Sequence, residues 1–193
     1  MRSFTLLTTA LVVASNVFAA PSGAGQGYCL CEKEAMAVAD NVQHFFSNYS
    51  DEFARKVFTK NIQDQTDSVQ FLMNNGTTCP APLGSTTFAN RKNLIKAQGA
   101  MGSLPWENEN VFWDCKNVFI RWISKQDPFP VQGIAIFRTA PNPNATPEIP
   151  YLIDHIFSEF NSGAWLVNLG FYQGVGFAPG CEGVVGPKGN QTL

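Results

Sequence analysis

The most unusual chemical group in the sequence is a carboxyl group inside an apolar stretch near the carboxyl end. In YLIDHIFSEF, Asp154 stands among the apolar residues Leu152, Ile153, Ile156 and Phe157. Burying a carboxyl group without partners costs roughly several kcal/mol, unless its pKa rises or it gains hydrogen bonds. A desolvated carboxyl group can donate a hydrogen bond or a proton near neutral pH, so Asp154 is a candidate catalytic acid.

Two interpretations of Asp154 stay open. If strand alternation places it on the concave face of a curved sheet, it is an acid in an apolar pocket. Alternatively, it forms an internal ion pair with Arg121 or Arg138 of neighbouring strands. Arg121, between Ile120 and Trp122, is either that partner or an anchor for an anionic group of a ligand.

The elements that must position these residues change type along the chain. Apolar residues spaced by three and four predict a helix over 32–49, and Ser50 is expected to cap a second helix with Phe58 on its apolar face. Further helices are expected over 68–74 and from Thr86 or Thr87 to Gly102. After Pro105, β-branched and aromatic runs predict five strands, over 111–115, 118–124, 131–139, 151–160 and 165–172.

Helices followed by strands predict an α+β fold, with the helices packed on one face of an antiparallel sheet. Turns are expected at 114–117 and 161–163. Several strands are apolar on both faces, which is typical of a sheet covered on both sides. Because the helices cover one face only, we expect the outer face to form a homodimer.

The two ends of the chain are expected to lie outside the domain. Arg2, the apolar run 4–13 and the small-residue site at 17–19 predict a signal peptide over 1–19, and therefore a secreted protein. A flexible leader follows over 20–28, the folded domain spans 29–173, and 174–193 is a Gly-rich flexible tail. Four N-x-[ST] triplets predict glycosylation, at Asn48, Asn75, Asn144 and Asn190.

Five cysteines are expected to be mostly paired in an oxidising compartment. We favour a bridge from Cys79 to Cys115, and a second one from Cys31 or Cys29 to Cys181. One thiol is left over, and the connectivity stays open.

Several functions are excluded by what the 193-residue sequence lacks. The net charge is −2, and the sequence has no run of Lys or Arg that could contact successive phosphates of a nucleic acid, so we expect no nucleic-acid partner. With two histidines and no C-x-x-C, we expect no metal and no cofactor. After the leader, no apolar run is long enough to span a membrane.

Segments over roughly 29–173 resemble the NTF2-like (SnoaL-like) superfamily, in particular secreted proteins of filamentous fungi. The matching segments are CLCEKEAMAVADNV, the stretch 67–69, PLGSTTF, VFIRW and EFNSGAWLVNLG. The resemblance implies helices packed on a strongly curved sheet, the NTF2-like cone. It implies a pocket more than a reaction, because most such proteins have no established activity.

IDHIFSEFNSGAWLVNLG also looks like the last hairpin of ketosteroid isomerase. That resemblance implies Asp154 as the protonated oxyanion donor and Asp67 as the general base, with Asp64 as the alternative. Asp64 and Asp67 also precede a short helix, where carboxylates commonly cap. The isomerase's tyrosine falls near Gln43 or His44, and neither is a phenol, so steroid isomerisation is not implied.

The cone implied by the resemblance gives aromatic side chains two roles, because the same rings can fill the core or line the pocket. The candidate ligand contacts are Phe46, Tyr49, Phe71 and Trp122, with Arg121 as the polar one. Our first hypothesis is a small apolar molecule bound in the cone. The alternatives are an acid–base enzyme of the isomerase, dehydratase or cyclase type, and an interaction protein whose cone is plugged by Phe46, Phe71 and Trp122.

Overall fold

The computed structural model of the protein describes residues 27–73 and 81–171. The expected signal peptide over 1–19, nearly all of the leader and the tail over 174–193 lie outside these residues, as do Cys79, Cys181, Asn75 and Asn190. No helix of the described part is long and apolar enough to cross a membrane.

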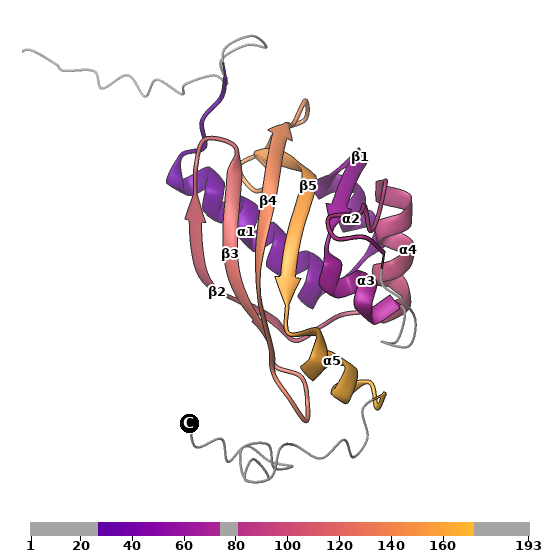
Figure 1. The fold of residues 1–193 in the computed structure, drawn as a ribbon. Helices are drawn as coiled ribbons and strands as arrows, with labels where there is room; N and C mark the ends of the chain where they lie inside the picture. Colours follow the sequence, from indigo (N-terminus) through magenta and orange to yellow (C-terminus); the bar gives the residue numbers. More distant parts are fainter. Residues whose placement is uncertain (1–26, 74–80, 172–193) are drawn as a thin grey trace, which may run out of the picture.

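In the described part of the chain, five helices precede, connect and follow the strands (Figure 1). Their bounds are Glu32–Ser47 for α1, Asp51–Val57 for α2, Asp67–Met73 for α3, Arg91–Met101 for α4 and Ser162–Asn168 for α5. As expected, Ser50 caps α2, because its hydroxyl accepts a hydrogen bond from Phe53 N at 3.2 Å. The helices expected over 32–49 and 68–74 are thus confirmed as α1 and α3.

Five strands form one curved sheet in the order β1-β5-β4-β3-β2. They are Phe58–Gln65 (β1), Trp106–Trp113 (β2), Asn117–Ser124 (β3), Val131–Pro141 (β4) and Tyr151–Phe160 (β5). Strands β2 to β5 pair antiparallel, whereas β1 pairs parallel to β5. The α+β class and the hairpin turn at 114–117 are confirmed, and the sheet is mixed at one edge.

Strand β1 is an element that the sequence did not indicate. Its residues FTKNIQDQ contain one apolar position after Phe58, because the strand lies at the edge of the sheet and exposes part of its length. Phe58 was expected on the apolar face of α2. It opens β1 instead and packs against Phe45 of α1, with ring centroids 4.7 Å apart.

The strand expected over 165–172 is wrong. Residues 162–168 form helix α5, and Asn161 caps it by accepting a hydrogen bond from Ala164 N at 3.0 Å. Asn161-Ser162-Gly163 is therefore a helix start and not a hairpin turn, because the Asn side chain serves the first free N–H groups of a helix. The hairpin that resembled the isomerase does not form within the described residues.

Another expectation changes at the loop that precedes α4. Thr87 N and Phe88 N both donate to the carbonyl of Asp64 on β1, and Asp64 N donates to Phe88 O, so residues 86–88 pair with the sheet. Because the backbone N–H groups of Thr87 and Phe88 are bound to β1, α4 begins at Arg91, capped by Asn90, and not at Thr86 or Thr87.

The disulfide expected between Cys79 and Cys115 is wrong, because Cys115 is bonded to Cys29. A backbone hydrogen bond of 3.1 Å from Leu30 N to Cys115 O holds the start of the domain beside the β2–β3 turn. Cys31 caps α1, is exposed, and has no disulfide partner within the described residues.

The helices lie on one face of the sheet, and α1 runs across β2 and β3 (Figure 1). Buried residues of α1, including Val38, Val42 and Phe45, meet buried residues of the sheet such as Ile120 and Phe137. On the outer face a cross-strand row joins the register partners Phe112, Phe119, Ile136 and Phe157. Ile134 on that face is 60% exposed.

Candidate functional site: an apolar pocket inside the cone

An open pocket of about 570 Å³ lies between the inner face of the sheet and helices α3, α4 and α5. This volume is within the range of pockets that hold small-molecule ligands. The helices contribute mainly aliphatic side chains, which include Val69, Leu72, Leu94, Ala97 and Met101. The cone is therefore not plugged.

Aromatic rings form one continuous wall of the pocket. Five residues from α1, β2, β3, β5 and α5 contact each other in sequence, with ring centroids 3.9 to 5.6 Å apart: Phe46, Trp106, Trp122, Phe160 and Trp165. Gly133 makes room for this wall. A Cβ atom there would lie 2.5 Å from Trp122 Cζ2, so no other residue fits without moving the ring.

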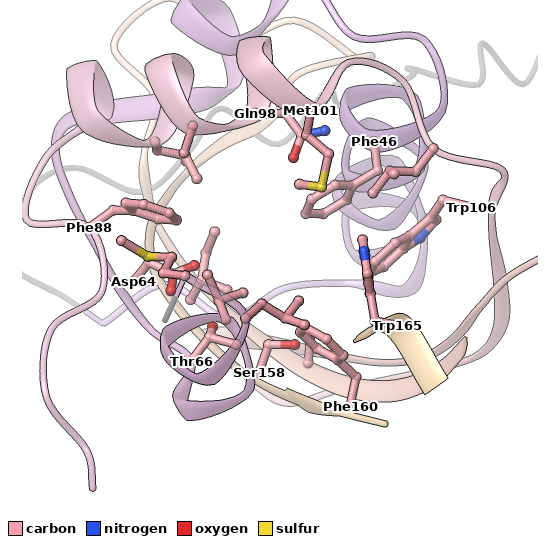
Figure 2. A pocket seen from close by; sticks show the side chains of 18 of the residues that line it. Phe46, Asp64, Thr66, Phe88, Gln98, Met101, Trp106, Ser158, Phe160 and Trp165 are labelled. Atoms are coloured by element: carbon pink, nitrogen blue, oxygen red, sulfur yellow. The ribbon is translucent and has the colours of Figure 1, made fainter. Parts of the chain in front are cut away.

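Asp64 of β1 is the carboxyl group that the structure places in this pocket. It is 6% exposed, and its Oδ1 has no hydrogen-bond partner among the described residues. Figure 2 shows Asp64 beside Phe88 and Thr66, across the cavity from Phe46, Trp106 and Trp165. The pocket thus has a carboxyl group on one side and aromatic rings on the other.

Burial raises the pKa of Asp64 from its ordinary value of 3.8 to about 6. The hydroxyl groups of Thr66 and Thr87 act in the opposite direction, and the negative charge of Glu159 adds to the increase. A carboxyl group with a pKa near 6 exchanges its proton close to neutral pH, so Asp64 can act as a hydrogen-bond donor, an acceptor or a general acid or base.

The aromatic wall of the pocket contains a second buried polar atom without a hydrogen-bond partner among the described residues, Trp122 Nε1. Trp122 Nε1 and Asp64 Oδ1 are the buried side-chain nitrogen and oxygen atoms of the described residues that lack a hydrogen bond. Buried polar groups are nearly always hydrogen-bonded in folded proteins, so each exception calls for a physical reason. Both exceptions occur in residues that line the pocket.

Asp67 lies outside the pocket, although it was the first choice for a general base. Its carboxylate accepts hydrogen bonds from Gly84 N at 3.0 and 3.1 Å, which ties α3 to the loop before α4. Its side chain therefore serves the backbone, as carboxylates at helix starts commonly do.

Asp154 also lies outside the pocket. Its oxygens accept hydrogen bonds from Arg138 Nε at 2.8 Å and Nη2 at 3.1 Å, and Arg138 alternates with buried Phe137 and Thr139. A bulge explains the placement: Arg138 pairs with His155 and Thr139 with Ile153, which leaves Asp154 unpaired and breaks the alternation. The structure thus matches the ion-pair interpretation.

The remaining predicted ligand contacts divide between the pocket and its surroundings. Phe46 and Trp122 line the pocket. The Tyr49 hydroxyl oxygen lies 2.7 Å from Asp51 Oδ1 and 2.9 Å from Ile95 O, and its one proton is shared between these two acceptors, so the group is held by α2 and α4. Arg121 points outward to Glu109, at 3.5 Å. Phe71 of α3 is not among the lining residues, whereas its neighbours Val69 and Leu72 are.

Exposed apolar side chains surround the opening of the pocket. Met73 of α3 is 62% exposed, Met101 of α4 is 48% exposed and Leu169 after α5 is 53% exposed, and all three also line the cavity. Exposed apolar patches of this kind are typical of binding grooves and interaction sites.

Residues 28–172 match the family model of the NTF2-like domain. The chain is a member of the NTF2-like family. No curated protein matches the sequence. The resemblance to this family is thereby confirmed for nearly the whole described part of the chain.

Solved structures with the same fold share little sequence with this NTF2-like chain. A loop truncation variant of IdmH has 10% identity and a TM-score of 0.51, over 70% of this chain and 98% of its own. Wild-type IdmH of Streptomyces antibioticus, a proposed polyketide cyclase, has 10% identity and a TM-score of 0.49, over 71% and 99%. An NTF-2-like protein of unknown function from Burkholderia xenovorans has 10% identity and a TM-score of 0.48, over 78% and 91%. These likenesses show the fold alone.

Proposed function

We propose that this NTF2-like protein binds a small, mainly apolar molecule in its cone. The observation that carries the proposal is the open pocket of about 570 Å³, walled by aromatic and aliphatic side chains around a single buried carboxyl group. Concave apolar pockets with a few polar groups are the usual ligand sites of proteins. The unpartnered atoms of Asp64 and Trp122 support it, because a ligand can supply the missing hydrogen bonds.

We favour binding over a catalytic mechanism that uses an acid–base pair. Such a pair needs two titratable groups within reach of one substrate. Asp64 lines the pocket, whereas the carboxylates of Asp67 and Asp154 are bound to Gly84 N and to Arg138 outside it. The second candidate is an enzyme that uses Asp64 alone, and the raised pKa of Asp64 is the observation in its favour.

Native mass spectrometry of the full chain, produced in a secreting host, tests the proposal. We expect a bound small molecule at one per chain, released when the protein is denatured, or taken up from a mixture of apolar metabolites. A folded protein that stays empty after this incubation would contradict the proposal.

We also propose that the protein is secreted and glycosylated. Asn48 and Asn144, the two predicted glycosylation sites in the described part, are both exposed. The same mass spectra test this, because cleavage after residue 19 and added glycans both change the mass. An unmodified full-length chain from a secreting host would contradict it.

We further propose a homodimer through the outer sheet face. The row of Phe112, Phe119, Ile136 and Phe157 and the exposed Ile134 support it, because an apolar face of this kind gains from being covered. The variant Ile134→Glu should elute as a monomer in gel filtration with light scattering, while Glu148→Gln should not change the oligomer. A wild-type monomer at high concentration would rule the dimer out.

A further inference from the structure

The pocket lacks a counter-ion for its carboxyl group. Among the described residues that line it, Asp64 is the one titratable side chain, and the other polar ones are the neutral Thr66, Gln98, Gln126 and Ser158. When ionised, a carboxylate accepts hydrogen bonds only, and Oδ1 receives none from the part of the chain that the structure describes. The missing group is therefore a hydrogen-bond donor, and a positively charged donor would also supply the missing charge.

Within the described residues, the cationic side chains of the elements packed against β1 are bound elsewhere or, like Lys92 and Lys96 of α4, exposed. On β5, Glu159 is negative and raises the pKa of Asp64, while His155 lies 3.3 Å from Gln65 Oε1. On α4, the Arg91 guanidinium donates to the carbonyl groups of Arg55 and Phe58, both at 2.8 Å. Asp154 of β5 is paired with Arg138. On α2, Arg55 and Lys56 pair with Asp51 and Glu52 of the same helix.

The opposite wall fits a ring system. The Phe46, Trp106 and Trp122 rings stack face to face, with interplanar angles of 16° and 20°, so Trp106 between them borders the cavity by its ring edge, against which an apolar ring can pack edge to face. Figure 2 shows Phe46 and Trp106 of this wall across the cavity from Asp64. A ligand that spans the pocket would thus place an apolar ring system on this wall and a donor group at Asp64.

We propose that the ligand is an amphiphilic amine, in which an apolar ring system lies on the aromatic wall and a protonated amine pairs with the Asp64 carboxylate. This inference rests on the proposed function and names the class of its ligand. Ion pairs gain little when both charges must first leave water, but the cost of burying Asp64 is already present in the free protein. Only the amine is desolvated on binding, so the ion pair adds net affinity.

The protonation state of Asp64 makes the affinity for an amine depend on pH in a defined direction. An ammonium group favours the ionised form of Asp64, so binding lowers the pKa of Asp64 and releases a proton near pH 6. The affinity for an amine should therefore rise as the pH rises through this value. A neutral alcohol that accepts a hydrogen bond from the protonated carboxyl group would behave in the opposite way, with affinity falling over the same range.

Isothermal titration calorimetry with two matched probes tests the proposal. The probes are 2-(1-naphthyl)ethylamine and 2-(1-naphthyl)ethanol, which differ in the terminal group alone, at about pH 7.5 and about pH 5. We expect the amine to bind at least about tenfold more tightly than the alcohol at the higher pH. We expect this preference to disappear at the lower pH, and the heat of amine binding near pH 6 to vary with the buffer as a released proton requires.

The variant Asp64→Asn is the matched control. It should bind both probes with similar affinity, and its binding of the alcohol shows that it is folded. An amine preference that survives in Asp64→Asn would overturn the inference, as would tighter binding of the alcohol by the wild-type protein at about pH 7.5. If neither probe binds the folded wild-type protein, the proposed function itself fails.

Discussion

At Asp64 the protein holds a carboxyl group in surroundings that disfavour its charge. Most side chains that line the pocket with it are apolar or aromatic, its Oδ1 has no hydrogen-bond partner among the described residues, and burial raises its pKa. Such a group lowers the stability of the fold whenever it is ionised. A cost of this kind is typical of a site kept for a ligand or a proton.

The pH dependence of stability tests this account of Asp64. The folded pKa of about 6 lies above the ordinary value of 3.8, so stability is full below the lower value and is lost as the pH rises through the higher one. At neutral pH the loss is about 3 kcal/mol. Asp64→Asn removes this pH-dependent loss. In urea unfolding, the free energy of unfolding of the variant relative to the wild type should therefore increase from about pH 4 to about pH 7. A difference that does not change with pH would contradict the assignment.

The sequence singled out Asp154 and gave Asp64 as an alternative general base, and it is Asp64 that the structure places in the pocket. Asp154 has apolar neighbours, yet a single bulge turns it toward Arg138, and a bulge leaves no clear mark in one sequence. Asp64 lies in the polar run NIQDQTD, and its burial comes from pairing with Phe88 and β5, which are distant in sequence. Phe88 was missed as a lining residue for the same reason, while Phe46 and Trp122 could be predicted from helix and strand periodicity.

At the scale of elements, helix α5 closes one end of the pocket with Trp165. The run AWLVNLG is apolar enough for a strand, and a short apolar run does not separate strand from helix. The Asn161 cap is the signal that could have decided it. Helix α1, by contrast, could be predicted because its buried residues repeat at helical spacing from Ala35 to Phe45.

Glu159 is expected to hold α3 against the sheet. Its oxygens accept hydrogen bonds from Asp67 N and Ser68 N, both at 3.0 Å, so a carboxylate of β5 caps the first turn of α3. Glu159→Ala should lower the free energy of unfolding by about 1–2 kcal/mol, since the freed N–H groups lose charged partners. It should also speed hydrogen exchange in α3, which lines the pocket.

The control for Glu159 is Glu148→Ala. Glu148 is exposed, and the contact that the structure gives it is through its backbone carbonyl to Asn41 Nδ2, at 2.7 Å, so this variant should change stability by less than about 0.5 kcal/mol. Equal effects of the two substitutions, or unchanged exchange in α3 of the Glu159 variant, would show that the cap does not stabilise the helix.

At the scale of the whole molecule, one sheet has two different apolar faces. The inner face and helices α3, α4 and α5 enclose the pocket, while the outer face is left without a helix in the described part of the chain. The two apolar faces could be predicted in outline, because strands that are apolar on both faces must be buried on both sides. The open volume could not be predicted, since it depends on how side chains from distant elements meet.

Binding of a neutral apolar dye, Nile red, measured by fluorescence with two tryptophan variants of α4, tests the central claim most directly. Ala97 lines the pocket, whereas its neighbour Lys96 is exposed on the same helix. We predict that one dye molecule binds per wild-type chain, that Ala97→Trp weakens binding at least about tenfold by filling the cavity, and that Lys96→Trp leaves it unchanged. Equal binding by the two folded variants would place the dye elsewhere and contradict a ligand pocket inside the cone.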